Sequence, residues 1–198
     1  MKVLVIAPHP DDETLCCAGT IMNFVEKGDK VKVVIVTDGR YGSPDKELKG
    51  TEKLVRIRRE EAMRVFKMLG VEDYEFLNFE DSKVNVKSKE VEEKLSEILK
   101  EYKPDIVFAP SPFDRHSDHS EIGKIVMKLF PNSYFYVVWG DKKEGEEVKF
   151  EIKDRRDKKS MALEEYKSQI DGLRKFLLLE KFTGNYEVFY KIKLDKKD

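Results

Sequence analysis

The sequence has little cysteine and no long hydrophobic run. Its only two cysteines, Cys16 and Cys17, are neighbours in the chain, so a disulfide between them is sterically poor and a reducing compartment is expected. No apolar stretch approaches the about 20 residues of a membrane span. The apolar start at 3–6 is followed at once by Pro8, His9 and the acidic residues 11–13, unlike a signal peptide. We therefore expect a cytoplasmic protein without a membrane span.

An excess of charge of either sign is also lacking. The 38 Lys and Arg residues balance 39 Asp and Glu residues, which predicts neither a nucleic-acid partner nor an acidic tail. Lys and Glu dominate the charged residues and Gln169 is the sole glutamine, a bias that resembles proteins from hot environments. A chain of 198 residues, 40% of them hydrophobic, is long enough for a substantial core. We expect one domain over residues 1–198.

Short apolar segments alternate with stretches of helical spacing. Segments rich in β-branched or aromatic residues lie at 3–7, 31–37, 74–77, 105–109 and 133–138, and helical spacing is found at 14–27, 52–69, 89–102 and 120–129. This alternation predicts an α/β fold, a Rossmann-like three-layer sandwich with a mostly parallel sheet and helices on both faces. After Gly140 we expect an edge strand at 148–152, a long charged helix at 157–176 and a final strand at 187–193.

All three histidines fall in two loops that follow predicted strands, where ligands of open α/β sheets bind. His9 follows the first strand, and His116 and His119 follow the fourth. Two imidazoles and a carboxylate form the ligand set of a catalytic zinc site, and zinc suits this mixture better than calcium or magnesium. Asp11 and Asp12 are adjacent, so one could bind the metal while the other takes a proton from water.

Each of these residues alone is as well explained by a structural role. A histidine after a strand is usually a cap or a satisfied polar group, and an Asp pair at the start of a helix is often an N-cap. The gathering of three histidines and four aspartates in two loops favours a catalytic site instead. His116 beside Asp118 would then suit an imidazole that stabilises the oxyanion of a tetrahedral intermediate.

Two motifs in these loops resemble the signatures of the LmbE-like, or PIG-L, family of zinc-dependent N-acetylglucosaminyl deacetylases. They are Pro-His-Pro-Asp-Asp-Glu at 8–13 and Asp-Arg-His-Ser-Asp-His at 114–119. The resemblance implies that zinc is bound by His9, Asp12 and His119 and that Asp11 is the general base. It also implies that His116 stabilises the oxyanion or protonates the leaving amine, that Asp118 tunes the basicity of His116, and that Arg58 and Asp81 contact the substrate.

The function expected from this resemblance is removal of an acetyl group from an N-acetylated amino sugar or glycoconjugate. One alternative is the same chemistry on another small N-acyl conjugate, such as a thiol-cofactor precursor or another amide. Another is a non-catalytic module that binds a glycan or nucleotide, which is disfavoured because no Gly-x-Gly-x-x-Gly loop follows the first strand.

Several further features leave alternatives open. The resemblance implies a homo-oligomer, a trimer or hexamer, for which Phe176, Phe182 and Phe189 either supply an interface or close the core. Tyr41 and Trp139 lie just beyond strand ends, where their rings either stack on a sugar or pack against the protein. Glu13 either supports the metal loop or caps a helix. The segment 40–52, rich in Gly and charge, is the best candidate for a mobile substrate loop.

Overall fold

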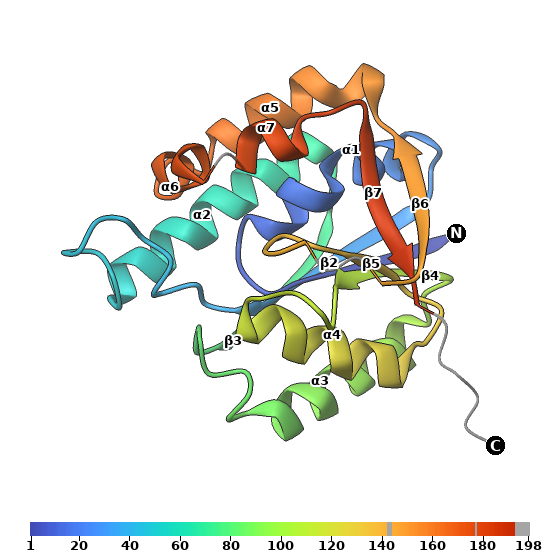
Figure 1. Cartoon of the computed structure of the whole chain (residues 1–198), viewed down its shortest axis with the longest axis horizontal. Helices are drawn as coiled ribbons and strands as arrows, with labels where there is room; N and C mark the ends of the chain where they lie inside the picture. Colours follow the sequence, from blue (N-terminus) through green and yellow to red (C-terminus); the bar gives the residue numbers. More distant parts are fainter. Residues whose placement is uncertain (142–143, 177, 193–198) are drawn as a thin grey trace.

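A central sheet with helices on both faces organises the chain (Figure 1). The structure is a computed structural model that describes residues 1–141, 144–176 and 178–192. The elements are, in chain order, β1 (Lys2–Ala7), α1 (Asp12–Glu26), β2 (Lys30–Thr37), α2 (Glu52–Leu69), β3 (Asp73–Phe79), α3 (Ser88–Tyr102), β4 (Ile106–Pro110), α4 (Ser117–Leu129), β5 (Tyr134–Tyr136), β6 (Glu146–Glu151), η1 (Lys153–Arg155), α5 (Arg156–Glu164), α6 (Ile170–Lys175), α7 (Leu178–Phe182) and β7 (Tyr186–Lys191). The predicted three-layer α/β fold is confirmed.

The strand order β3-β2-β1-β4-β5-β7-β6 determines where the loops meet. Strands β1 to β5 run parallel, and β7 is antiparallel to both β5 and β6. The chain winds outward from β1 in one direction through β2 and β3, and in the other through β4 and β5. The carboxyl ends of β1 and β4 therefore lie side by side at the point where the direction reverses, which is where ligands bind in such sheets.

The hydrophobic core consists of two layers on opposite faces of the sheet. Alternate residues of β1 point to opposite sides, so that Val3 and Val5 pack under α1 and α2 while Leu4 and Ile6 pack under α3 and α4. All of these β1 side chains are fully buried. A parallel strand covered on both faces reads as a continuous apolar run, which is why the pattern at 3–7 predicts it.

Strand β5 is shorter than the predicted segment 133–138. It pairs with β4 only over Tyr134–Tyr136, and the chain then leaves the sheet. The backbone N–H groups of Val138 and Trp139 donate to the carboxylate of Asp114, at 2.8 and 3.1 Å, instead of to a neighbouring strand. A side chain after β4 thus ends β5 and fixes the direction of the segment that follows.

The long helix predicted at 157–176 is wrong, because the chain turns between α5 and α6. Tyr166 is fully buried in the turn, and Ser168 donates from its backbone N–H and its hydroxyl to the carboxylate of Glu61 on α2, at 2.8 and 2.6 Å. These contacts fix the chain in a turn that the local pattern of charges does not reveal. The predicted edge strand is found as β6, and the final strand as β7; Lys193 of that prediction lies outside the described residues.

None of the helices formed by the described residues is both long and apolar enough to span a lipid bilayer. Cys16 and Cys17 are free thiols, and both are buried in α1.

Candidate active site

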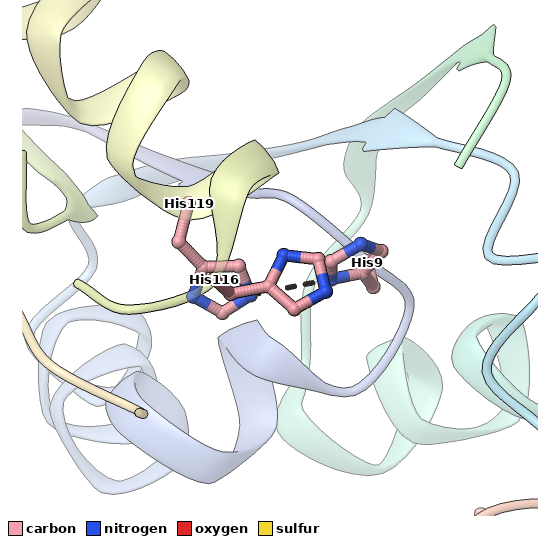
Figure 2. Close-up of side chains that lie close together, drawn as sticks. All are labelled: His9, His116 and His119. Carbon is pink, nitrogen blue, oxygen red and sulfur yellow. Dashed lines mark hydrogen bonds between the residues drawn. The ribbon is translucent and has the colours of Figure 1, made fainter. Parts of the chain in front are cut away.

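Three side-chain atoms from the two predicted loops meet in a small triangle. His9 Nδ1 lies 3.1 Å from Asp12 Oδ2, His119 Nε2 lies 3.1 Å from the same oxygen, and the two nitrogens are 3.3 Å apart. His9 belongs to the loop after β1, Asp12 begins α1, and His119 lies in the first turn of α4. Figure 2 shows the rings of His9, His116 and His119 converging from these two places.

The triangle has the size and composition that a tetrahedral metal ion requires. Ligand atoms about 2.0–2.1 Å from a tetrahedral zinc ion lie about 3.3–3.4 Å from one another. Burial by itself raises the pKa of Asp12, but the imidazoles of His119 and His9 outweigh it and lower that pKa below its ordinary value. The carboxylate is therefore ionised, and a set of two nitrogens and one oxygen fits zinc chemistry.

Other donor atoms surround the same histidine. A ring nitrogen of His116 lies within 4.8 Å of those of His9 and His119, and carboxylate oxygens of Asp81 and Asp118 form a second group with His9 within the same distance. In that second group the oxygens face His9 Nε2, at 3.3 Å each. His9 thus turns Nδ1 toward the triangle and Nε2 toward two carboxylates.

The ring nitrogens outside the triangle face carboxylates. His9 Nε2 faces Asp81 and Asp118, and His119 Nδ1 lies 3.5 Å from Asp114 Oδ2. Carboxylates in this position fix the tautomer and the orientation of a metal-binding imidazole. His119 Nδ1 has no hydrogen bond to any described residue, so its interaction with Asp114 is the contact available to it. Sequence reasoning missed this role of Asp114, although Asp114 opens the second motif.

Asp118 and Asp81 lie differently from what was expected. The carboxylate of Asp118 accepts from Ser82 N at 2.7 Å and contacts His9, and only its backbone N–H reaches His116, at Nδ1. Asp81 lines the cavity, but its oxygens contact His9 and accept from Tyr41 N at 2.9 Å. Both carboxylates therefore hold His9 in place, and their expected roles toward His116 and the substrate stay predictions.

Asp11 is held next to the triangle in an unusual backbone conformation. Its φ of 144° and ψ of −30° lie in a region that non-glycine residues rarely adopt. Its backbone N–H donates to Glu13 Oε2 at 3.1 Å, and Glu13 in turn accepts from Thr14 Oγ1 and from the hydroxyl of Tyr166. Glu13 therefore supports the loop, a role that the sequence alone left open.

The charge of Asp11 is set by burial and by one cation. Burial raises the pKa of Asp11 to about 7, although Arg58 Nη2, 3.2 Å from Asp11 Oδ2, opposes the shift. Arg58 also donates to Gly39 O at 2.7 Å and to Pro10 O at 2.8 Å. It therefore connects the loop after β2 to the loop after β1. Its predicted contact with substrate stays a prediction, although it lines the cavity.

His116 forms part of the cavity wall beside the triangle. Its ring centroid lies 4.8 Å from that of His9 and 4.9 Å from that of His119. Nδ1 accepts a hydrogen bond from Asp118 N at 3.3 Å, which leaves Nε2 to carry the proton of the neutral ring. Burial, together with the nearby His9 and His119, lowers the pKa of His116.

A cavity of about 420 Å³ opens directly over these residues. It is large enough for a small-molecule ligand. One end is lined by His9, Asp11, Asp12, Arg58, Asp81 and His116. The other walls come from the loop after β2, which includes Tyr41, from the segment after β5, and from the chain around α6 and α7. The last of these walls was not predicted, because its residues up to Phe176 lie in the single charged helix expected at 157–176.

The structure bears on two further expectations, the mobile loop at 40–52 and the role of three phenylalanines. The two ends of the loop are joined, because Gly50 N donates to Arg40 O at 2.6 Å and Arg40 forms ion pairs with Asp38 and Glu52. Of the three phenylalanines considered for an interface, Phe189 is fully buried in the core and Phe182 packs against it, whereas Phe176 is 58% exposed at the rim of the cavity.

Several known proteins are similar to this chain in sequence. A diacetylchitobiose deacetylase of Thermococcus kodakarensis is 35% identical over 125 residues, which cover 62% of this chain and 46% of the relative. A probable N-acetyl-alpha-D-glucosaminyl L-malate deacetylase 2 of Bacillus anthracis is 28% identical over 182 residues, 84% of this chain and 80% of the relative. The chain therefore spans about half the length of the Thermococcus relative and most of the Bacillus one.

The fold is shared with solved deacetylase structures. The N,N'-diacetylchitobiose deacetylase from Pyrococcus horikoshii, solved with its inhibitor MPG, superposes with a TM-score of 0.79 at 29% identity, covering 95% of this chain and 82% of that chain. Residues 4–130, well over half of the chain, match the family model described as PIG-L, GlcNAc-PI de-N-acetylase. The chain belongs to the PIG-L family.

Proposed function

We propose that this protein is a zinc-dependent N-deacetylase that hydrolyses the acetyl amide of an N-acetylated amino sugar or glycoconjugate. The observation that carries the proposal is the triangle of His9, Asp12 and His119 atoms, 3.1 to 3.3 Å apart, beside a cavity that His9, Asp11 and Asp12 line. The names of the Thermococcus and Bacillus relatives, a diacetylchitobiose deacetylase and a probable N-acetyl-alpha-D-glucosaminyl L-malate deacetylase, support an N-acetylated sugar as the substrate.

His9, Asp12 and His119 would hold the metal. Zinc bound there would supply a Lewis acid for the amide carbonyl and would make water a better nucleophile at neutral pH. The carboxylates of Asp81, Asp114 and Asp118 would hold the two imidazoles in orientation, as carboxylates behind metal-binding histidines do elsewhere. Asp11 is then the carboxylate of the site that neither binds the metal nor orients an imidazole.

Asp11 is suited to act as the general base. Hydrolysis adds the oxygen of water to the acetyl carbon and breaks the carbon–nitrogen bond, so one proton must leave the water and one must reach the amine. The pKa of Asp11, raised to about 7 by burial, matches a base that works near neutral pH. Arg58 contacts the carboxylate of Asp11, and the hydrogen bond to Glu13 holds the Asp11 backbone in its unusual conformation. The products are an amine and acetate.

His116 is suited to stabilise the oxygen that gains negative charge during the reaction. With Nδ1 occupied by the N–H of Asp118, the hydrogen on Nε2 is available to the oxygen that gains charge when water adds to the amide. The proton that reaches the leaving amine would be the one that Asp11 takes from the water, because a neutral imidazole that gave up its Nε2 hydrogen would become an anion. The place of His116 in the cavity wall, a few ångströms from the rings of His9 and His119, supports its role toward the charged oxygen.

Two variants separate metal binding from proton transfer. We expect Asp11→Asn to retain bound zinc while losing most turnover, and His119→Ala to lose the zinc itself. Zinc is measured by atomic emission, and free amine is measured with N-acetylglucosamine and its β-linked dimer as substrates. Asp154→Asn, an exposed carboxylate on η1, is the matched control. Full activity in either test variant contradicts the assignment.

The same assay distinguishes the alternatives. Turnover of a different N-acyl compound, with the amino sugars inert, would favour an amidase of a thiol-cofactor precursor or another small conjugate. Purified protein without stoichiometric zinc and without turnover would favour a binding module for glycans or nucleotides.

We further propose that residues 1–198 form one domain of a cytoplasmic, homo-oligomeric protein from a hot environment. The free buried thiols of Cys16 and Cys17 support a reducing compartment, and the excess of Lys and Glu supports the thermal origin. Light scattering on the purified chain tests the oligomer, for which a trimer or hexamer is expected.

A further inference from the structure

A second cavity, of about 370 Å³, shares a wall with the first and has no part in the proposed chemistry. The segment after β5 lines the first cavity with Val138 and Trp139 and the second with Val137. Helix α7 gives Leu178 to the first cavity and Lys181 to the second. Strands β6 and β7, which pair with each other (Figure 1), line the second cavity alone. The same pieces of chain therefore border both cavities.

The acidic groups that line the second cavity are matched within the protein or face solvent. Glu187 accepts from Lys159 Nζ at 2.7 Å and from two backbone N–H groups of α1. Glu147 Oε1 lies 3.1 Å from Lys149 Nζ, and the side chain of Asp141 is 98% exposed. These carboxylates therefore leave little uncompensated negative charge inside the cavity.

Lys181 is the cation of the second cavity that has no acidic partner among the described residues. Its Nζ donates to Val138 O at 2.7 Å and lies 4.9 Å from the centroid of the Phe182 ring. A lysine ammonium carries three N–H donors, and the carbonyl of Val138 uses one of them. An anionic group that enters the cavity would therefore find its counter-charge at Lys181.

Aromatic rings form much of the remaining lining. They belong to Tyr136, Phe182, Tyr186 and Tyr190. Two of the hydroxyl groups are already used, because Tyr136 donates to a carbonyl of β1 at 2.9 Å and Tyr190 donates to Glu147 Oε2 at 3.4 Å. A flat aromatic body packs favourably against such rings, and the volume of the cavity suits a small molecule.

We propose that the second cavity is an effector site for a small aromatic carboxylate. The carboxylate would pair with Lys181, and the aromatic body would lie among the four rings of the lining. Lys181 would then give up its hydrogen bond to Val138 O, in the segment that borders both cavities. Because Val138 and Trp139 donate to Asp114, the carboxylate that faces a candidate metal ligand, a change in this segment would reach the first cavity. Binding itself is independent of the proposed function, whereas the effect on turnover rests on it.

Calorimetry with matched ligands tests the chemical class. The zinc-loaded full chain is titrated with benzoate, with benzamide, which has the ring without the charge, and with acetate, which has the charge without the ring. We expect benzoate to bind at least about three- to ten-fold more tightly than either of the others, since it alone uses both Lys181 and the rings. Equal affinities for benzoate and benzamide, or no binding of benzoate, overturn the proposal.

Lysine variants locate the ligand. Lys181→Met should raise the Kd of benzoate by about three- to ten-fold, whereas Lys181→Arg keeps the charge and should leave the Kd within about two-fold. The matched control is Lys175→Met, because Lys175 is the lysine that lines the first cavity. A Kd that Lys181→Met leaves unchanged would mean that benzoate binds elsewhere, for example beside the metal, and overturns the proposal.

Tryptophan emission and kinetics test the effect on the first cavity. Trp139 is the only tryptophan of the chain, so its emission reports on the segment that borders both cavities. We expect benzoate to change this emission with the Kd found by calorimetry. It should also raise KM for N-acetylglucosamine to a plateau, as a ligand at a distinct site does. A KM that rises without limit indicates direct competition and overturns the effector site, and so does binding that changes neither emission nor KM.

The outcomes separate this proposal from the proposed function. Benzoate binding that depends on Lys181, in a protein that releases no amine, supports the second cavity as a binding site and overturns the proposed chemistry. Turnover in a protein that does not bind benzoate overturns the effector site and leaves the deacetylase intact.

Discussion

A buried ion pair under α1 gives a stability prediction with a defined magnitude. Lys159 Nζ on α5 donates to Glu187 Oε1 on β7 at 2.7 Å and to Leu15 O of α1 at 2.6 Å. The two side chains are 0% and 2% exposed. Glu187 also accepts from Gly19 N and Thr20 N. We predict that Lys159→Met, which keeps the length of the side chain, lowers the free energy of unfolding by about 3–5 kcal/mol because it leaves a buried carboxylate without its cation.

Urea unfolding monitored by circular dichroism measures this change. With a slope of about 2 kcal/mol per molar urea, the midpoint should fall by about 1.5–2.5 M while the slope stays constant. The control is Arg174→Met, which removes a 2.8 Å ion pair to Glu164 whose side chains are 55% and 53% exposed. We expect that change to be below about 1 kcal/mol, because exposed pairs gain little in water.

A double variant tests the reason for the loss. Lys159→Met combined with Glu187→Gln removes both charges and leaves an acceptor for the backbone of α1. It should be more stable than Lys159→Met alone, since no unpaired charge then remains buried. If Lys159→Met unfolds at the same urea concentration as the unaltered protein, the argument from buried charge is refuted.

Three further predictions concern the site. Asp114→Asn should weaken zinc binding by about 10- to 100-fold, measured by competition with a chelating dye, because the carboxylate facing His119 is lost. Tyr166→Phe should lower kcat about ten-fold with zinc content and KM unchanged, because Glu13 loses a hydrogen bond while it holds the backbone of Asp11. Gly123→Ala should lower the free energy of unfolding by about 1–3 kcal/mol in urea, because its methyl group would lie 2.6 Å from Pro110 O.

Each of these has an outcome that contradicts it. Unchanged zinc affinity in Asp114→Asn would mean that the 3.5 Å approach to His119 has no effect on the metal. A Tyr166→Phe variant that loses zinc or raises KM would show a general disturbance of the loop. Gly172→Ala is the control for Gly123→Ala, since an added methyl group at Gly172 meets nothing within 4 Å, and equal losses in the two would refute the steric argument.

Local signals account for the parts of the fold that the sequence predicts well. The helix over Glu52–Leu69 begins where Thr51 accepts from Leu54 N at 3.2 Å and ends at Gly70, whose φ is 79°. Both residues are recognisable in the sequence as caps. The break between α5 and α6 has no such signal, because it depends on Ser168 reaching Glu61 on a distant helix. Sequence position cannot reveal a contact of that kind.

In the site, too, some features follow from the sequence and others depend on contacts between distant residues. The convergence of His9, Asp12 and His119 follows from the neighbouring places of β1 and β4 in a parallel sheet, which motif spacing and strand order anticipate. The direction of each carboxylate does not follow, because it depends on which backbone N–H groups lie within reach. Asp118 turns to Ser82 N and His9 rather than to the ring of His116, and Asp114 turns to the segment after β5.

The hydrogen bonds of Asp114 couple two properties that protein engineers usually vary separately. One oxygen faces His119 and also accepts from Val138 and Trp139, where the cavity wall begins. Mutant libraries or loop exchanges that include residues 137–139 would therefore change metal retention together with substrate choice. Diversity placed at Phe176, which lines the same cavity and meets the ring of Trp139, would leave the hydrogen bonds of Asp114 in place.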